Sequence, residues 1–386
     1  MDNIEVLKKL KEFISGGTIL VRSPGRINLI GEHTDYNEGF VLPAAIDKAA
    51  YVALTPRADN KVYLYATDLK EQYVTDIDEI IRVNDSNWPN YLLGVVHQFK
   101  LAGVKLQGFN AVLTSDVPIG AGLSSSAAVE CAMALALNKI LNADFTKLTL
   151  AKMAQKAEHD FAGVRCGIMD QFASIFGKQN HVIRLDCRSL EYQYVPFHLK
   201  GIKIVLFDTD VKHSLAASEY NIRRTQCENG VELIKQHFPD IKSLRDVSIE
   251  MLEKYVLPVD RTIYSRCKYV VEENNRLQRA CSDLSNNDIL SFGKKMFETH
   301  DGLSQLYNVS CDELDFLVDS VRDESSVLGA RMMGGGFGGC TINLVKENAV
   351  DALIEKVSSL YKKIMHKHLK AYIAETADGT SIIKTI

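Results

Sequence analysis

Hydrophobic and polar positions in the first half of the chain follow two different periods. Short runs rich in β-branched and aromatic residues, typical of strands, alternate with longer segments in which apolar positions recur every three or four residues. The short runs predict strands at residues 18–21, 51–54, 62–65, 109–113 and 182–185, and the longer segments predict helices at 127–141 and 149–161. We therefore expect an α+β or mixed α/β fold in this half.

The pattern starts again after about residue 194. The segment GIKIVLFDTD predicts a strand, and CTINLV predicts another at residues 340–345. Three long segments between them predict helices at 218–236, 264–280 and 289–306. Because 386 residues exceed the usual size of a single core, we expect an N-terminal domain at residues 1–194 and a C-terminal domain at 195–386.

Composition and charge indicate a globular protein without a nucleic-acid or membrane partner. Hydrophobic residues make up 46% of the chain and charged residues 24%, which is ordinary for a folded domain. The formal net charge of −4 gives no electrostatic reason to bind nucleic acid or an anionic membrane. Residues 1–17 predict a short amphipathic helix rather than a signal peptide, and the apolar run 127–141 is too short to cross a bilayer.

The cysteines indicate a reducing compartment. None of them forms a CxxC pair or stands at zinc-ligand spacing with histidine, so free thiols that serve as small core residues are expected. Disulfides are rare in the cytoplasm, which is therefore the predicted location. The eight cysteines lie at positions 131, 166, 187, 227, 267, 281, 311 and 340.

The stretch RSPGRINLIGEHTDYNEGFVL places four ionisable residues between two runs that resemble buried strands: Arg26, Glu32, His33 and Asp35. Burying such groups is costly unless they are paired or bind a polar ligand. The sequence leaves two alternatives, a structural salt-bridge cluster and a binding site.

A second stretch, DVPIGAGLSSSAAVE, combines a glycine turn with three serines and an apolar helix. Glycines allow close backbone approach, and a helix N-terminus offers free N–H groups to an anion, so a phosphate cradle is possible. The alternative is a buried helix capped by serine, although one cap needs only one of Ser124, Ser125 and Ser126. Neither the Walker-type loop nor the protein-kinase motifs occur in the chain.

Two acidic residues have both a plain and a chemical interpretation. In CGIMDQFASIFG, a helical face that ends at Gly177 places Asp170 at or before the first turn, where it would be an N-cap or an ionised proton acceptor. Glu158 falls at the edge of a helix face, where it would be a surface residue or a ligand for a metal beside phosphate.

A late glycine cluster lies in GARMMGGGFGGC, with five glycines between positions 334 and 339 just before a strand. Glycine loses more conformational freedom on folding than any other residue, so such a cluster inside a domain is costly. Either it is a flexible loop, or its backbone lies close to a ligand or to another loop.

In this order and spacing, the PGRxNLIGEHTDY, GLSSSA and GGGFGG motifs resemble the GHMP kinases, and within them the galactokinase family. The resemblance extends from about Arg22 to Leu344, and Thr34, Asp35 and Tyr36 are its specific part. It implies an α+β, two-domain GHMP kinase fold with a mixed-sheet N-terminal domain, an α/β C-terminal domain and the active site between them. It also implies galactose and ATP as substrates, Mg²⁺ as cofactor and a monomer.

The resemblance also implies a role for each matching residue. Asp170 would accept the proton of the C1 hydroxyl, and Arg26 would orient that hydroxyl and stabilise the transferred phosphoryl group. Ser126 and Glu158 would bind Mg²⁺, and the glycine loop around Gly335 would close the site. The sugar would be held by Glu32, His33, Thr34, Asp35, Gly167 and Tyr220, and the ATP phosphates by Gly120, Ala121, Gly122, Leu123, Ser124, Ser125 and Ser126.

Two positions depart from the family pattern, Ile27 where Val is common and Glu38 where Gly is common, and the latter could alter its loop. Three functions remain open: a kinase for galactose, a kinase of the same fold for N-acetylgalactosamine, and a non-catalytic galactose sensor. Sensors of this family lose part of the serine loop, whereas residues 124–127 are intact here.

Overall fold

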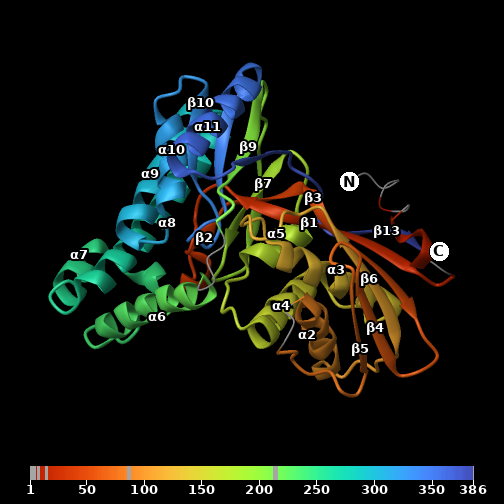
Figure 1. The fold of residues 1–386 in the computed structure, drawn as a ribbon. Helices are drawn as coiled ribbons and strands as arrows, with labels where there is room; N and C mark the ends of the chain where they lie inside the picture. The colour runs from red at the N-terminus through yellow and green to blue at the C-terminus, as the bar shows by residue number, and fades with distance from the viewer. Residues whose placement is uncertain (1–5, 7–8, 14–15, 85–87, 212–215, 386) are drawn as a thin grey trace.

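The computed structural model describes residues 6, 9–13, 16–84, 88–211 and 216–385 (Figure 1). A six-stranded sheet with the order β13-β1-β3-β6-β4-β5 forms the framework of the N-terminal half. Strands β4 and β6 pair in parallel and the other neighbours are antiparallel, so the sheet is mixed, as predicted. The strands are β1 (Ile19–Asn28), β3 (Pro43–Pro56), β4 (Lys61–Ala66), β5 (Glu71–Asp76), β6 (Phe109–Ser115) and β13 (Ser381–Thr385).

Helices α2 (Trp88–Leu101), α3 (Ser125–Ile140), α4 (Lys147–Ala157) and α5 (Met169–Phe176) pack beside this sheet. Helix α3 is apolar on nearly every side because it lies between the sheet and the other helices. Strands β1 and β3 are buried along almost their whole length, since a small cluster that includes Val6 and Leu10 covers part of their other face. This burial explains why their sequences lack strict alternation.

A second, antiparallel sheet with the order β10-β11-β9-β12 forms the C-terminal part. Helices α9 (Ile289–Asp301) and α10 (Asp312–Arg322) pack on β10, and α11 (Val350–Met365) shares a core with β9 and β10. The longer α6 (Ala216–Lys235) and α8 (Arg261–Ser285) extend from it together with the short α7 (Ile249–Met251) (Figure 1). The strands are β9 (Ile202–Asp208), β10 (Val327–Met332), β11 (Cys340–Lys346) and β12 (Lys370–Ala374).

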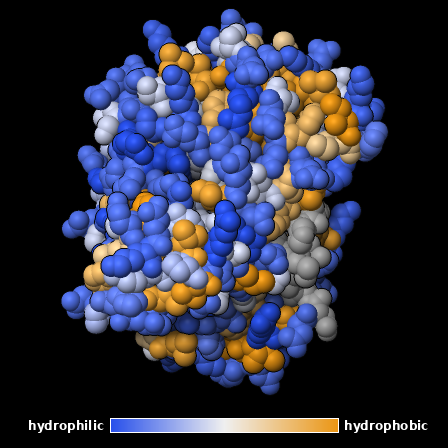
Figure 2. All heavy atoms as spheres, turned by 90° about the vertical axis from the view of Figure 1, so that its left-hand side faces the viewer, coloured by the Kyte–Doolittle hydropathy of each residue, from blue (hydrophilic) through white to orange (hydrophobic). Residues whose placement is uncertain are grey.

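A small third sheet consists of β2 (Phe40–Val41), β7 (His181–Asp186) and β8 (Tyr192–Pro196); β7 contacts β3 of the large sheet, and β2 and β8 contact α8. The side of the molecule that carries α6, α7 and α8 is mostly hydrophilic, with apolar side chains in separate groups (Figure 2). In the described part of the chain, no helix is both long and apolar enough to cross a membrane. All eight cysteines are free thiols, as predicted, and six are buried.

The predicted strands and helices are present, but several have different ends. Strand β1 runs on to Asn28 because a register shift between Pro24 and Arg26 accommodates the turn-like Pro-Gly pair. Helix α4 ends at Ala157 and continues as the π turn η3 (Glu158–Ala162), while α9 continues as η6 (Gly302–Tyr307). The N-terminal helix predicted at residues 1–17 lies partly outside the described residues, which contain residues 6, 9 and 10, the short η1 (Lys11–Phe13) and a turn at residues 16–17.

Candidate active site

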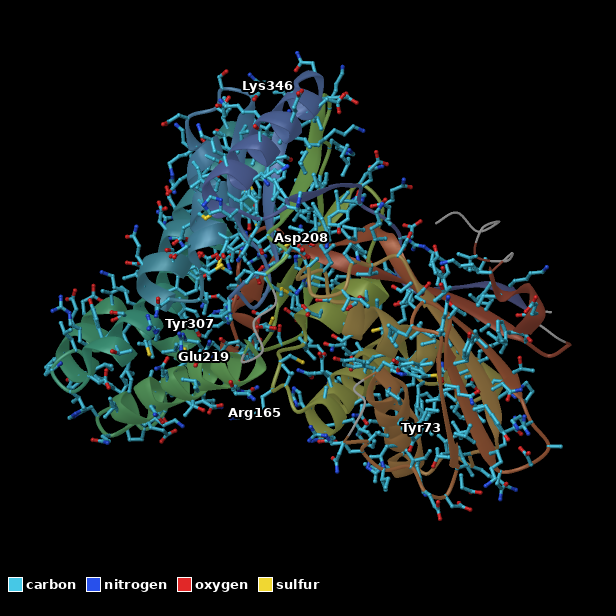
Figure 3. The ribbon with its side chains drawn as sticks, in the orientation of Figure 1. Tyr73, Arg165, Asp208, Glu219, Tyr307 and Lys346 are labelled. Atoms are coloured by element: carbon cyan, nitrogen blue, oxygen red, sulfur yellow. The ribbon has the colours of Figure 1, made fainter. Side chains whose placement is uncertain are left out.

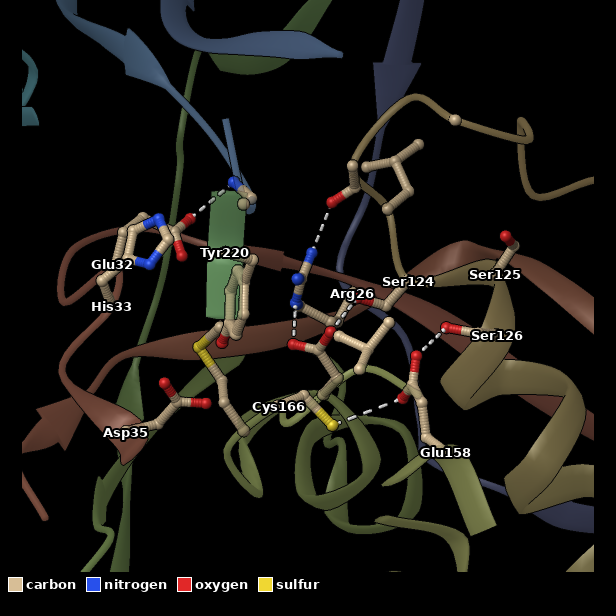
Figure 4. A pocket seen from close by; sticks show the side chains of 18 of the residues that line it. Arg26, Glu32, His33, Asp35, Ser124, Ser125, Ser126, Glu158, Cys166 and Tyr220 are labelled. Carbon is tan, nitrogen blue, oxygen red and sulfur yellow. Dashed lines mark hydrogen bonds and ion pairs between the residues drawn. The ribbon is translucent and has the colours of Figure 1, made fainter. Parts of the chain in front are cut away.

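A cavity of about 290 Å³ lies where the loop after β1, the N-terminus of α3, the start of α5 and the glycine loop meet (Figure 4). Both halves of the chain contribute to it, as predicted. Most of the predicted site residues line it, but Thr34, Ala121 and Gly167 do not. The lining residues are Arg26, Glu32, His33, Asp35, Pro118, Gly120, Gly122, Leu123, Ser124, Ser125, Ser126, Glu158, Val164, Cys166, Met169, Asp170, Tyr220, Gly334 and Gly335.

Asp170 lies in the first turn of α5 and is held from two sides. Its Oδ1 accepts a 2.7 Å hydrogen bond from Arg26 Nε, and its Oδ2 accepts a 2.5 Å hydrogen bond from Ser124 Oγ. The N-cap of α5 is Ile168, and Asp170 makes no capping bond, so the N-cap interpretation is wrong. Charge-assisted bonds of this kind fix the carboxylate in one orientation toward the cavity.

Arg26 connects the sheet to the serine loop. Its side chain is 4% exposed, and its Nη1 donates a 2.5 Å hydrogen bond to the carbonyl oxygen of Gly122. Its backbone N–H donates to the carbonyl of Leu123 at 3.1 Å. Burial lowers the pKa of this guanidinium, but the charges of Asp170, Glu32 and Asp35 outweigh burial and hold the pKa above its usual value. Arg26 is therefore a permanent cation at the centre of the site.

Glu32 is buried and is held by the C-terminal part of the chain. Its Oε1 accepts hydrogen bonds from Arg331 Nη2 and from the backbone N–H of Gly334, each at 2.8 Å. Burial raises the pKa of this carboxyl, but the charges of Arg331 and Arg26 and the two hydrogen bonds hold the pKa below its usual value. Glu32 is thus an ionised hydrogen-bond acceptor in the wall of the cavity.

His33 and Thr34 have different roles in the same loop. His33 has a left-handed backbone with φ of 61°, and its Nδ1 lies 2.7 Å from the Tyr36 hydroxyl. Burial lowers the pKa of His33 to about 4, so its imidazole is neutral at pH 7. Thr34 instead donates its hydroxyl to the carbonyls of Gly31 and Phe40 at 2.9 and 2.5 Å, which holds the loop itself together.

Asp35 lies beside Gly167, on the other side of the cavity from the serine loop (Figure 4). A Cβ atom on Gly167 would lie 2.0 Å from Asp35 Oδ2, so the two residues touch. Burial and the charge of Asp170 raise the pKa of Asp35 to about 7. The charge of Arg26 lowers the pKa of Asp35 only in part, and no cation of the described residues forms an ion pair with this carboxylate, so hydroxyl groups of a ligand would satisfy it.

The three serines have three different environments. Ser124 is the N-cap of α3 but makes no capping bond, because its backbone is left-handed with φ of 56° and its hydroxyl bonds to Asp170. Ser126 Oγ donates a 2.9 Å hydrogen bond to Glu158 Oε1, and Ser125 lines the cavity. The capped-helix alternative is therefore wrong. The first backbone N–H groups of a helix have no partner within the helix, so those at the start of α3 can bind an anion.

Glu158 is a buried carboxyl at the edge of the cavity, not a surface residue. Its Oε2 accepts a 2.7 Å hydrogen bond from Gln171 Nε2, and Cys166 Sγ lies at 3.5 Å. Burial and the charge of Asp170 raise the pKa of Glu158 to about 7, although Ser126, Cys166 and Gln171 lower it. A cation would relieve this excess of buried negative charge.

The oxygen donors of Ser126 and Glu158 fit Mg²⁺, which prefers oxygen ligands and is usually held by one or two protein groups plus substrate phosphates. Within the described ranges, no group of three or more His, Cys, Asp or Glu side chains is arranged to hold a metal ion. A metal held by Ser126 and Glu158 would therefore complete its coordination with water and substrate phosphate oxygens.

The glycine cluster is a close-packed loop, which answers the alternatives left open by the sequence. A Cβ on Gly334 would lie 3.2 Å from the Cα of Gly122, and one on Gly336 would lie 2.1 Å from the carbonyl oxygen of Val309. Both glycines also have positive φ, 85° and 89°, which other residues rarely adopt. The loop thus packs against the serine loop while Gly334 binds Glu32.

Tyr220 reaches the cavity from α6, and its ring lies 5.2 Å from the ring of His33. The loop before α5 holds α6 in place through Arg165, whose side chain pairs with Glu228 at 2.9 Å and whose carbonyl accepts from Arg224 at 2.8 Å. Arg165 lies between the two halves of the molecule (Figure 3). The position of Tyr220 therefore depends on contacts between the halves.

Glu38 retains the loop shape despite its departure from glycine. Its φ is 57°, in the left-handed region where glycine is favoured. Its carboxylate pairs with Arg188 at 2.8 Å. Glu38 does not line the cavity.

The structure adds residues that the motifs did not single out. Arg331 supports Glu32, and Gln171 supports Glu158. An arginine in an apolar strand just before the glycine cluster was a signal that could have identified Arg331, because a buried cation requires a partner. Gln171, next to Asp170, carried no such signal.

Comparisons with known proteins show what this chain is similar to. Residues 10–56 match the "Galactokinase galactose-binding signature", residues 90–178 the "GHMP kinases N terminal domain" and residues 280–363 the "GHMP kinases C terminal" family model. The chain is 41% identical to a galactokinase of Roseiflexus sp. (strain RS-1) over 361 residues, which cover 94% of this chain and 92% of that protein. It is 42% identical to a galactokinase of Thermotoga petrophila over 363 residues, 94% of this chain and 99% of that protein.

Solved structures show the same similarity. The crystal structure of Lactococcus lactis galactokinase complexed with galactose superposes with a TM-score of 0.92 at 34% identity and covers 98% of this chain and 99% of that one. A mevalonate kinase superposes with a TM-score of 0.66 at 18% identity, over 93% of this chain and 99% of that one. The second similarity shows a shared fold only.

Proposed function

The chain belongs to the galactokinase family of the GHMP kinases, and from this premise we propose that it is a kinase that phosphorylates D-galactose. It transfers the γ-phosphoryl group of ATP to the C1 hydroxyl and gives α-D-galactose 1-phosphate and ADP. The observation that carries the proposal is the position of Asp170. It lies between two acidic residues suited to a sugar, Glu32 and Asp35, and a serine loop suited to phosphates.

The sugar site is built from fixed acceptors. Carboxylates form charge-assisted bonds with hydroxyl groups, and such bonds offset the cost of their burial. Glu32 and Asp35 provide these acceptors, and the neutral ring of His33 and the ring of Tyr220 add apolar and polar contact. Thr34 and Gly167 act by shaping this site, since the first braces the loop and the second packs on Asp35.

Proton transfer and phosphoryl transfer are assigned to two neighbouring residues. Asp170 accepts the proton of the C1 hydroxyl, the C1 oxygen forms a bond to the γ-phosphorus, and the bond from that phosphorus to the β–γ bridging oxygen breaks, so ADP leaves. Arg26 orients the hydroxyl and stabilises the negative charge on the phosphoryl group in transfer. Because Arg26 binds both Asp170 and the Gly122 carbonyl, it places the proton acceptor beside the phosphate loop.

The loop of residues 120–126 would hold the ATP phosphates through its backbone N–H groups and serine hydroxyls. Ser126 and Glu158 would hold Mg²⁺ together with phosphate oxygens. When bound, Mg²⁺ neutralises charge on the phosphates and so favours transfer. The contact between Gly334 and Gly122 supports a role of the glycine loop in covering this region.

A coupled ADP-release assay with a panel of hexoses tests the proposal. A site that hydrogen-bonds one particular hydroxyl leaves buried groups unpaired with the epimer, so kcat/KM for glucose should be lower than for galactose by about 10³-fold or more. Phosphorus NMR of the product should locate the phosphate on C1. Comparable kcat/KM for galactose and glucose, or a preference for N-acetylgalactosamine, would refute the assignment.

The non-catalytic sensor is disfavoured because each part of the phosphate-transfer machinery is in place, including the intact serine loop and the Arg26–Asp170 pair. The eight free thiols favour a reducing compartment, so we place the protein in the cytoplasm. We further propose that it is a monomer, which light scattering coupled to gel filtration would test.

A further inference from the structure

Arg331 is a fully buried arginine in β10, and it is among the largest completely buried side chains of the described residues. A buried guanidinium is very costly unless its donors are paired. None of the roles assigned above uses this residue directly. Its partners therefore indicate what it does.

Three of the four acceptors of Arg331 lie at the end of β1 or in the loop after it, residues 29–39, which we call the sugar loop. The fourth is the carbonyl of its neighbour Met332. Its Nε donates to the Leu29 carbonyl at 2.8 Å, and its Nη2 donates to the Asn28 carbonyl at 2.5 Å. Nη1 donates to the Met332 carbonyl at 2.6 Å. Nη2 also donates to Glu32 Oε1 at 2.8 Å. The planar guanidinium group of Arg331 therefore holds both the backbone at Asn28 and Leu29, which leads into the sugar loop, and the carboxylate of Glu32 in that loop.

The bonds to Glu32 leave one of its oxygens for a ligand. The two bonds that its carboxylate receives from the described residues, from Arg331 and from the Gly334 N–H, both end on Oε1. Glu32 nevertheless lines the cavity, where Figure 4 shows its carboxylate bonded to the glycine loop on one side. Oε2 is thus available to accept a sugar hydroxyl.

This inference rests on the proposed function. We propose that Arg331 is a positioning residue for galactose: it holds Glu32 so that Oε2 faces the sugar, and the shared Oε1 joins the sugar loop to the glycine loop at Gly334. Loss of Arg331 should weaken galactose binding specifically. The ATP side should change little, because Arg331 contacts neither the serine loop nor Glu158.

Two substitutions of Arg331 should weaken galactose binding to different extents. Arg331→Lys keeps the positive charge but loses the planar fork, and Arg331→Gln keeps amide donors but loses the charge. A misplacement of about 1 Å in a binding group costs up to about 10²-fold, so we expect galactose KM and calorimetric Kd to rise about 10-fold for the lysine variant and about 10²-fold for the glutamine variant. The KM for ATP should stay within about threefold of wild type.

Arg266→Lys is the matched control. Arg266 is also a buried arginine, and it donates to the Leu306 carbonyl without contacting the cavity. This variant should lose melting temperature without a change in galactose Kd. If Arg331 only stabilised the fold, the Arg331 variants would likewise have a lower melting temperature and an unchanged Kd for galactose.

Three results would overturn the proposal. The first is that folded Arg331→Lys and Arg331→Gln bind galactose with the wild-type Kd. The second is that the KM values for galactose and ATP rise equally, and the third is that neither variant folds, which would make Arg331 a residue that stabilises the fold. The wild-type chain in the same assay separates this test from the proposed function. A wild type inactive on galactose refutes that function, whereas an active wild type with unaffected variants refutes the role of Arg331 alone.

Discussion

Replacement of Gly167 by alanine should weaken galactose binding and leave ATP binding unchanged. A Cβ at this position would lie 2.0 Å from Asp35 Oδ2, 2.1 Å from its Cγ and 2.7 Å from its Cβ. Non-bonded carbon contacts need about 3.5 Å, so one of the two residues must move by roughly 1.5 Å. A rotation of the Asp35 side chain alone cannot remove the clash, because the Cβ of Asp35 would also lie closer to the added Cβ than non-bonded carbon atoms allow.

The size of this displacement sets the expected kinetic effect. A misplacement of about 1 Å costs up to about 10²-fold, so kcat/KM for galactose should fall about 10²-fold in Gly167→Ala, mostly through a higher KM. The KM for ATP should stay within about threefold of wild type, since Gly167 does not line the phosphate side of the cavity. Steady-state kinetics in the ADP-release assay, with each substrate varied in turn, provides both numbers.

The matched control is Gly16→Ala. Gly16 has no atom within 4 Å of an added Cβ and no positive φ, so the same substitution there should leave both KM values unchanged. Melting temperatures of both variants show whether the fold is kept. An unchanged galactose KM in folded Gly167→Ala would refute the reasoning that Asp35 must stay where Gly167 allows it.

Two further predictions concern metal binding and pH. Ser126→Ala and Glu158→Gln should raise the Mg²⁺ concentration needed for half-maximal activity and weaken the binding of Mg²⁺-ADP measured by calorimetry. The Kd for galactose without nucleotide should stay near wild type. A large loss of galactose affinity in both variants would place the metal elsewhere. Because the pKa of Asp35 is raised to about 7, this carboxyl binds a proton below that pH and loses it above, and the ionised form is the better hydroxyl acceptor. Galactose affinity should therefore rise between pH 6 and 8 and then level off, and Asp35→Asn should flatten this calorimetric profile; a flat wild-type profile would contradict the assignment.

Local features of the site could be predicted from the sequence. The grouping of Glu32, His33 and Asp35 follows from their closeness along the chain, and the position of Asp170 at a helix start follows from the apolar face that ends at Gly177. The excess of serines over the single residue that a cap needs also indicated a second role, and none of them caps the helix by its side chain.

Contacts between distant parts of the chain could not be predicted in this way. Arg331 and Glu32 are 299 positions apart, and no local pattern specifies their pairing. Strand β13 (Ser381–Thr385) likewise pairs with β1 at the other end of the chain. Its short sequence fits an exposed tail as well as it fits a strand. The helical segments predicted at 149–161 and 289–306 end within one residue of η3 and η6, but the change from α-helix to π turn inside each segment was not predicted, because a π turn has no distinct hydrophobic period.

The most direct test of the central claim is the kcat of Asp170→Asn. Asparagine keeps the shape of the side chain and one acceptor for Arg26 or Ser124, but it removes the proton acceptor from beside the C1 hydroxyl. We predict a fall in kcat of about 10² to 10⁴, the usual contribution of a positioned general base, with a much smaller change in galactose Kd because Glu32 and Asp35 remain. A folded Asp170→Asn variant with near-normal kcat would contradict the account.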